Sequence, residues 1–160
     1  MPIVREVLAD MGLTLNEEKS RVVRAEKGFD FLGFRFVCRY SQRHGRRKAY
    51  FFPSPKAVER VKEKVRDRCV NHVLHVRVED VVRNVNNVLR GWWAYYRCSN
   101  ASRAFGKVQM YANDRMRRYL RRRKKKTGLG RYRDYTNEYL HKELGLVCIT
   151  DQGSVRYSSR

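Results

Sequence analysis

Apolar and polar residues alternate in the first third of the chain and recur with helical spacing in the rest. Residues 29–38 follow a period of two with apolar side chains on both faces, which predicts a strand covered on both sides. Shorter strands are predicted at residues 21–25 and 49–52, with a basic hairpin loop at residues 39–48. A short amphipathic helix is predicted at residues 3–11, ahead of the strands.

The spacing of apolar residues changes to 3.6 at Ser54, which stands where a helix N-cap is expected, directly before Pro55. Three helices are predicted from there: one starting at Ser54, one from about residue 78 to a break at residues 98–100, and one over residues 102–124. Their predicted core stripes are Val58, Val61, Val65 and Cys69; Val81, Val82, Val85, Val88, Leu89, Trp92 and Tyr96; and Phe105, Val108, Tyr111, Ala112, Met116, Tyr119 and Leu120.

These elements predict an α+β fold, in which a small antiparallel β element precedes a three-helix bundle. We expect three parts: the β element in residues 1–53, the helical domain in residues 54–126, and a basic loop, short helix and tail in residues 127–160. The first helix starts almost at residue 1, so we expect the chain to be a fragment of a longer protein. Without a signal peptide or an apolar run of about 18 residues, we expect a cytoplasmic, ribonucleoprotein-associated protein with no membrane partner.

Charge is the most informative bulk property of the chain. It has 37 Lys and Arg residues against 16 Asp and Glu, a net charge of +21, and the excess is larger in the second half. Repulsion among so many positive charges opposes a compact state. The same charges favour binding to a polyanion, because binding releases its counterions. Nucleic acid is therefore the expected partner. A merely soluble basic protein and a protein that binds an anionic membrane surface are the weaker alternatives.

Residues 117–126 contain eight basic residues in ten. A solvated helix face is the usual explanation of such a run, but beside the net charge we interpret it as a phosphate-binding segment. The four cysteines form no Cys-x-x-Cys pair and the four histidines are scattered, so no metal site is expected. No nucleophile–base triad or phosphate-cradling glycine loop is recognised either.

Four short motifs occur in order within residues 5–125. They are Gly-Leu-Thr-Leu-Asn-Glu-Glu-Lys-Ser at 12–20, Phe-Leu-Gly-Phe at 31–34, Leu-Arg-Gly-Trp-Trp-Ala-Tyr-Tyr at 89–96 and Ser-Arg-Ala-Phe at 102–105. Together they resemble the group II intron reverse transcriptase/maturase family. The resemblance implies that residues 1–53 are the C-terminal end of the polymerase palm and that residues 54–126 are the maturase-specific thumb, domain X.

The resemblance also implies roles for single residues. Lys19 would lie near the phosphates of an incoming nucleotide, and Phe31, Leu32, Gly33 and Phe34 match a hairpin that grips the primer end. The alternatives are that Lys19 is a turn lysine and that the three apolar residues belong to the core. The predicted RNA-binding set is Arg90, Trp93, Tyr95, Arg97, Arg103, Lys107, Arg117, Arg118, Arg121, Arg122, Arg123, Lys124, Lys125 and Lys126. Of these, Trp93 and Tyr95 lie off the apolar stripe, which suits base stacking or an interface with another subdomain.

The main departure from the family is the missing carboxylate centre. Polymerases of this kind hold two metal ions with a Tyr-x-Asp-Asp block and an earlier aspartate, and this chain has no Asp-Asp dipeptide. We therefore expect no cofactor in this chain, with Mg²⁺ required only by a complete parent polymerase, and no polymerase activity by the chain alone.

We expect the chain to bind intron RNA or a template–primer duplex through its basic thumb and so assist splicing and mobility. The alternative is a subunit or split part of an active RNA-directed DNA polymerase, completed by an upstream palm and finger polypeptide. An unrelated DNA-binding protein is the third possibility, but the chain shows no short helix-turn-helix pair and the hairpin would be unexplained.

Overall fold

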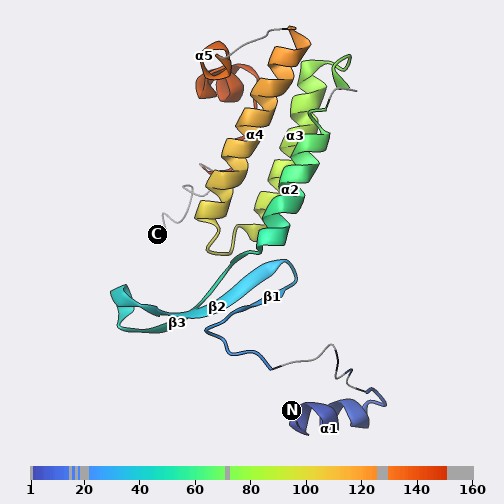
Figure 1. Ribbon diagram of the computed structural model, residues 1–160, viewed down its shortest axis with the longest axis vertical. Helices are drawn as coiled ribbons and strands as arrows, with labels where there is room; N and C mark the ends of the chain where they lie inside the picture. Colours follow the sequence, from blue (N-terminus) through green and yellow to red (C-terminus); the bar gives the residue numbers. More distant parts are fainter. Residues whose placement is uncertain are drawn as a thin grey trace, which may run out of the picture.

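A computed structural model describes residues 2–14, 16, 18, 22–70, 73–125 and 130–150. Three long helices stand side by side with a small antiparallel sheet across one end (Figure 1), which confirms the α+β class. In chain order the elements are α1 (Pro2–Asp10), β1 (Phe29–Phe31), β2 (Phe34–Ser41), the 3₁₀ turn η1 (Gln42–His44), β3 (Arg46–Pro53), α2 (Pro55–Asp67), α3 (Val78–Tyr96), α4 (Ser102–Arg123), α5 (Arg131–Asp134) and the π-helix η3 (Tyr139–Glu143).

The predicted single strand over residues 29–38 is wrong, because the chain reverses within it. Strands β1 and β2 form a tight hairpin in which Phe31 pairs with Phe34. The two turn residues, Leu32 and Gly33, have φ angles of 47° and 81°. Positive φ at both positions is typical of a type I′ turn, which favours Asn-Gly and disfavours leucine. The usual sequence signal of a hairpin was therefore absent.

The remaining β predictions are partly corrected. Strand β3 is longer than expected, and β2 continues beyond residue 38 to Ser41. The two strands pair from Phe34–Pro53 to Ser41–Arg46, so the loop predicted at residues 39–48 shrinks to η1 and Gly45. Of the strand predicted at residues 21–25, the described residues 22–25 form no strand. The order of the sheet is β1-β2-β3, which leaves β1 at an edge.

The helical predictions are confirmed. Ser54 caps α2 by accepting a hydrogen bond from the Ala57 amide at 3.2 Å, and Pro55 opens the helix. The apolar stripes of α2, α3 and α4 form one core in which Val65, Leu89 and Met116 are fully buried. Among the described helices, none combines the length and the apolar character that crossing a membrane requires.

The segment after α4 completes the core, which the sequence did not predict. Leu140, Leu146 and Ile149 are buried against the bundle. The Asn86 side chain on α3 donates to the Gly145 carbonyl at 2.8 Å and accepts from the Val147 amide at 2.8 Å. These hydrogen bonds satisfy an irregular backbone that would otherwise be costly to bury.

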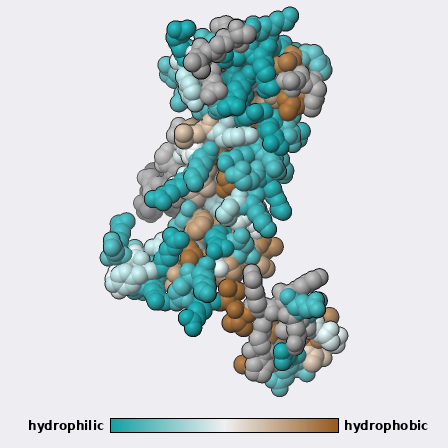
Figure 2. Space-filling model, viewed as in Figure 1, coloured by the Kyte–Doolittle hydropathy of each residue, from teal (hydrophilic) through white to brown (hydrophobic). Residues whose placement is uncertain are grey.

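The β1–β2 hairpin exposes apolar side chains. Phe31 and Leu32 are 59% and 69% exposed, so the alternative that assigned them to the core is wrong. Figure 2 shows hydrophobic residues gathered where the sheet faces α1, while hydrophilic residues cover most of the visible face of the bundle. The predicted division of the chain into three domains stays a prediction.

Candidate nucleic-acid interface

Most arginines in the basic run of α4 form hydrogen bonds or ion pairs within the protein. Arg117 is only 3% exposed; its Nε donates to the Tyr135 carbonyl at 2.6 Å, and its guanidinium also bonds Asn137 Oδ1 and lies 4.5 Å from the Tyr132 ring centroid. Arg121, 8% exposed, forms an ion pair with Asp134. These two arginines attach α5 and the turn that follows it to α4.

The neighbouring arginines also have partners within the chain. Arg122 donates to the Cys69 carbonyl at 2.7 Å, and Arg123 donates to the Leu74 carbonyl at 2.6 Å, so both fasten the segment between α2 and α3. Arg118 pairs with Asp114 at 2.8 Å along the helix. The part of the run that lies in α4, residues 117–123, covers about two helical turns, so it faces the protein as well as the solvent.

The other members of the predicted set are dispersed. In the described part of the chain, the exposed side chains of Lys124 and Lys125 have no hydrogen bond or ion pair, whereas Lys126 and Lys19 lie outside the described residues. Arg90 and Arg97 are exposed on and just after α3. Phosphate binding by the whole set stays a prediction. Arg117 and Arg121 would have to leave buried partners to contact a ligand.

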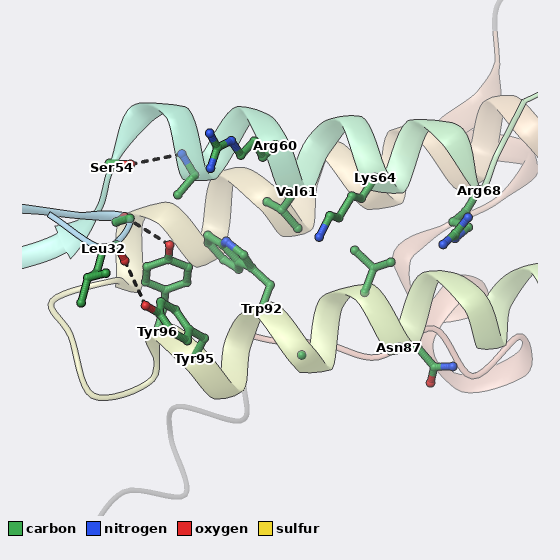
Figure 3. A pocket seen from close by; sticks show the side chains of 14 residues that line it. Leu32, Ser54, Arg60, Val61, Lys64, Arg68, Asn87, Trp92, Tyr95 and Tyr96 are labelled. Atoms are coloured by element: carbon green, nitrogen blue, oxygen red, sulfur yellow. Dashed lines mark hydrogen bonds between the residues drawn. The ribbon is translucent and has the colours of Figure 1, made fainter. Parts of the chain in front are cut away.

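A groove of about 720 Å³ lies between α2 and α3 (Figure 3). Its α2 wall carries Arg60, Lys64 and Arg68, which we call the α2 cation row. Its α3 wall includes Trp92 and Tyr95, and the Leu32–Gly33 turn of the hairpin lies at one end. We call this space the α2–α3 groove. Lys64 reaches from α2 toward α3, and Trp92 reaches from α3 toward α2 (Figure 3).

The positive charges of the α2 cation row are not paired with acidic side chains of the described residues. Its members are spaced four residues apart, which places them on one face of α2 at steps of about 6 Å along the axis. All three are exposed, and no described residue forms a hydrogen bond or ion pair with their side chains. Three adjacent positive charges on the wall of a groove create a local positive potential that attracts anions.

The floor of the groove is aromatic and fixed in place. The Trp92 ring packs against Tyr96 at 5.1 Å and Phe105 at 5.5 Å between centroids. Its indole N–H is buried and has no acceptor in the described part of the chain. Gly91 also lines the groove, and a Cβ there would meet no atom within 4 Å, so the missing side chain leaves the groove open.

Two tyrosines attach the hairpin turn to α3. Tyr95 Oη donates to the Leu32 carbonyl at 2.9 Å, and Tyr96 Oη donates to the Gly33 carbonyl at 3.1 Å. Both rings pack on Phe34, with centroids at 5.3 Å and 4.8 Å. Burial raises the pKa of the Tyr96 phenol, which keeps it protonated as a donor. The Phe-Leu-Gly-Phe and Trp-Trp-Ala-Tyr-Tyr motifs, far apart in sequence, therefore form one end of the groove.

These contacts leave the predicted stacking residues in different surroundings. Tyr95 remains 55% exposed beside the groove, although its ring already stacks on Phe34. Trp93 is half-buried against the core, with the Arg97 guanidinium 5.7 Å from its ring centroid. Only Tyr95 of the two lines the α2–α3 groove.

Gly33→Ala tests the attachment of the hairpin. A Cβ at Gly33 would lie 2.6 Å from Tyr96 Oη, and the φ of 81° adds backbone strain. Gly45→Ala is the matched control, because Gly45 also has positive φ, 59°, but nothing within 4 Å of a Cβ. We expect Gly33→Ala to lower the free energy of unfolding in urea by about 1–3 kcal/mol more than the control. Equal losses would contradict the attachment.

No group of three or more His, Cys, Asp or Glu side chains gathers in the described part of the chain, so no residue set is assigned to Mg²⁺.

Residues 58–139 match the family model of the group II intron maturase-specific domain. The chain belongs to the group II intron maturase family. The matched region begins inside α2 and ends in η3, so it includes the α2 cation row and the α3 wall of the groove. No curated protein matches the chain. The family indicates a maturase-related role in splicing, with intron RNA as the general partner.

The α2 cation row was not predicted as a binding site from the sequence. Arg60, Lys64 and Arg68 are absent from the predicted RNA-binding set. The available signal was their spacing of four residues, since it predicts one continuous stripe on a helix.

Proposed function

We propose that this maturase binds intron RNA in the α2–α3 groove, with the α2 cation row on successive phosphates of one strand. The observation that carries the proposal is the row itself: three exposed cations on one helix face, without partners among the described residues, along the wall of a groove with an aromatic floor. The family match supports intron RNA as the polyanion.

The chemistry of the walls favours contact with the RNA backbone. Lysine and arginine neutralise phosphates and release counterions, which supplies most of the affinity without reading sequence. The open side of the groove at Gly91 leaves room for riboses, and the Trp92 ring on the floor offers them an apolar surface. Recognition would therefore depend mainly on the shape of the folded RNA.

A salt titration tests this proposal. For a structured group II intron RNA, the slope of log affinity against log salt should be about −2 or steeper, because three phosphate contacts contribute about −0.7 each. Duplex DNA of equal length is the comparison ligand, and we expect the intron RNA to bind more tightly at every salt concentration. Affinity that does not change with salt would contradict the proposal.

The second candidate function is a part of an active RNA-directed DNA polymerase. The exposed apolar side chains of Phe29, Phe31 and Leu32 around the hairpin favour it, since an apolar surface of this kind suits a protein partner such as a palm polypeptide. We propose that the chain has no polymerase centre of its own, consistent with the absence of an Asp-Asp dipeptide. Primer extension by the purified chain with Mg²⁺ should stay at background, and incorporation above background would overturn this part of the proposal.

A further inference from the structure

A second cavity lies on the opposite flank of α2 from the α2–α3 groove. It has a volume of about 710 Å³ and is bounded by the β2–β3 face of the sheet, the first turns of α2 and the first turns of α4. We call it the α2–α4 pocket. It shares no lining residue with the α2–α3 groove, so the two sites can be altered separately.

The floor of the α2–α4 pocket is apolar and aromatic. Tyr50 and Phe52 are two residues apart on β3, so both rings stand on the same face of the sheet. Val37 is paired with Tyr50 on β2 and belongs to the same floor, and Val58 of α2 closes one side. Both rings are half-buried, which leaves part of each ring accessible to a ligand.

The rim of the pocket is cationic. Arg39, Arg103 and Lys107 are exposed, and their side chains have no hydrogen bond or ion pair with any described residue. The acid in the lining, Glu59, is paired with Lys62 at 2.7 Å. The rim therefore presents three uncompensated positive charges above an apolar floor.

We infer that the α2–α4 pocket binds an unpaired nucleotide of the RNA, with its base on the aromatic floor and its flanking phosphates on the rim. This inference rests on the proposed RNA-binding function and adds a second site to it. Charge complementarity selects a polyanion, and the floor selects one that also offers a flat apolar face. A paired base inside a duplex cannot reach the floor, whereas a base in a loop or bulge can.

The experiment compares two double variants of the full chain. Arg39→Gln/Tyr50→Leu removes one rim charge and one floor ring, while Tyr40→Leu/Arg43→Gln removes the same charge and ring type from exposed positions of the same hairpin outside the pocket. The ligands are a single-stranded oligonucleotide carrying 2-aminopurine and an RNA hairpin with a fully paired stem. Circular dichroism confirms that both variants are folded.

We expect Arg39→Gln/Tyr50→Leu to weaken binding of the single-stranded ligand by about tenfold, from one stacked base and one phosphate contact, and to remove the fluorescence change of 2-aminopurine. Binding of the paired stem should change no more than with the control variant. Equal effects of the two variants on the single strand would overturn the pocket site. Binding of an acidic peptide in the pocket, without binding of RNA there, would also overturn the pocket site. The proposed function fails separately, if substitution of the α2 cation row leaves RNA binding unchanged.

Discussion

Replacing Arg60, Lys64 and Arg68 together with glutamine is expected to weaken binding of intron RNA about 100-fold at 0.1 M salt. The physical reason is the loss of three phosphate contacts, each of which contributes about 0.7 to the slope of log affinity against log salt. Between 1 M and 0.1 M salt, three such contacts add about two log units of affinity, and the substitution removes this gain. The slope itself should become shallower by about two. Fluorescence anisotropy with a labelled intron RNA at several salt concentrations measures both quantities.

The control removes the same charge elsewhere. Arg43, Arg46 and Lys56 are exposed, have no side-chain hydrogen bond or ion pair with a described residue, and line neither cavity. Their triple replacement by glutamine should weaken binding only a few-fold, through the long-range field. A larger loss from Lys124→Gln/Lys125→Gln than from the α2 cation row would instead favour the end of α4 as the phosphate contact.

Arg117→Met is expected to lower the free energy of unfolding by about 3 kcal/mol. The substitution removes the donor to the Tyr135 carbonyl beside two buried side chains, and it removes one of the two donors to Asn137 Oδ1, the other being the Asn113 amide. It also removes one of the two arginine contacts that attach α5 and the following turn to α4, while the Arg121–Asp134 ion pair remains. Urea denaturation followed by circular dichroism measures the change.

Arg118→Met is the matched control, one residue away on the same helix. The Arg118 side chain is 48% exposed and pairs with Asp114 along α4, a type of contact that contributes less than about 1 kcal/mol. We expect its substitution to leave stability nearly unchanged. If Arg117→Met kept full stability but reduced RNA affinity, the internal role assigned to Arg117 would be wrong.

The helices could be predicted from the sequence because their signals are local. The 3.6-residue period of α2, α3 and α4 and the Ser54–Pro55 start of α2 follow from side-chain chemistry within a few residues. The apolar spacing also predicted the buried faces of the three helices, since Val65, Leu89 and Met116 occupy predicted core positions.

The hairpin could not be predicted in this way, because tertiary contacts hold it. Leu32 adopts a positive φ that leucine disfavours, and Tyr95 and Tyr96, more than sixty residues away, bond the turn carbonyls. The alternating pattern of apolar and polar residues therefore predicted one continuous strand through the turn. The segment around Leu146 and Ile149 was missed for a similar reason, since its backbone is held by side chains of α3 and α4.

The candidate site illustrates the limit of composition as evidence. Net charge predicted a polyanion partner, but it could not distinguish arginines that bind carbonyl groups inside the protein from cations that face a groove. Arg122 and Arg123 belong to the first group because the segment between α2 and α3 offers unpaired carbonyls beside α4. Lys64 belongs to the second group because no described residue of opposite charge pairs with it.

Photocrosslinking of an intron RNA containing 4-thiouridine, with the crosslinked peptides identified by mass spectrometry, tests RNA binding in the α2–α3 groove most directly. The account predicts crosslinks in residues 91–96 of α3 and in the turn at residues 31–33, reduced when the α2 cation row is replaced. Crosslinks confined to residues 117–125 of α4, unchanged by that replacement, would contradict it.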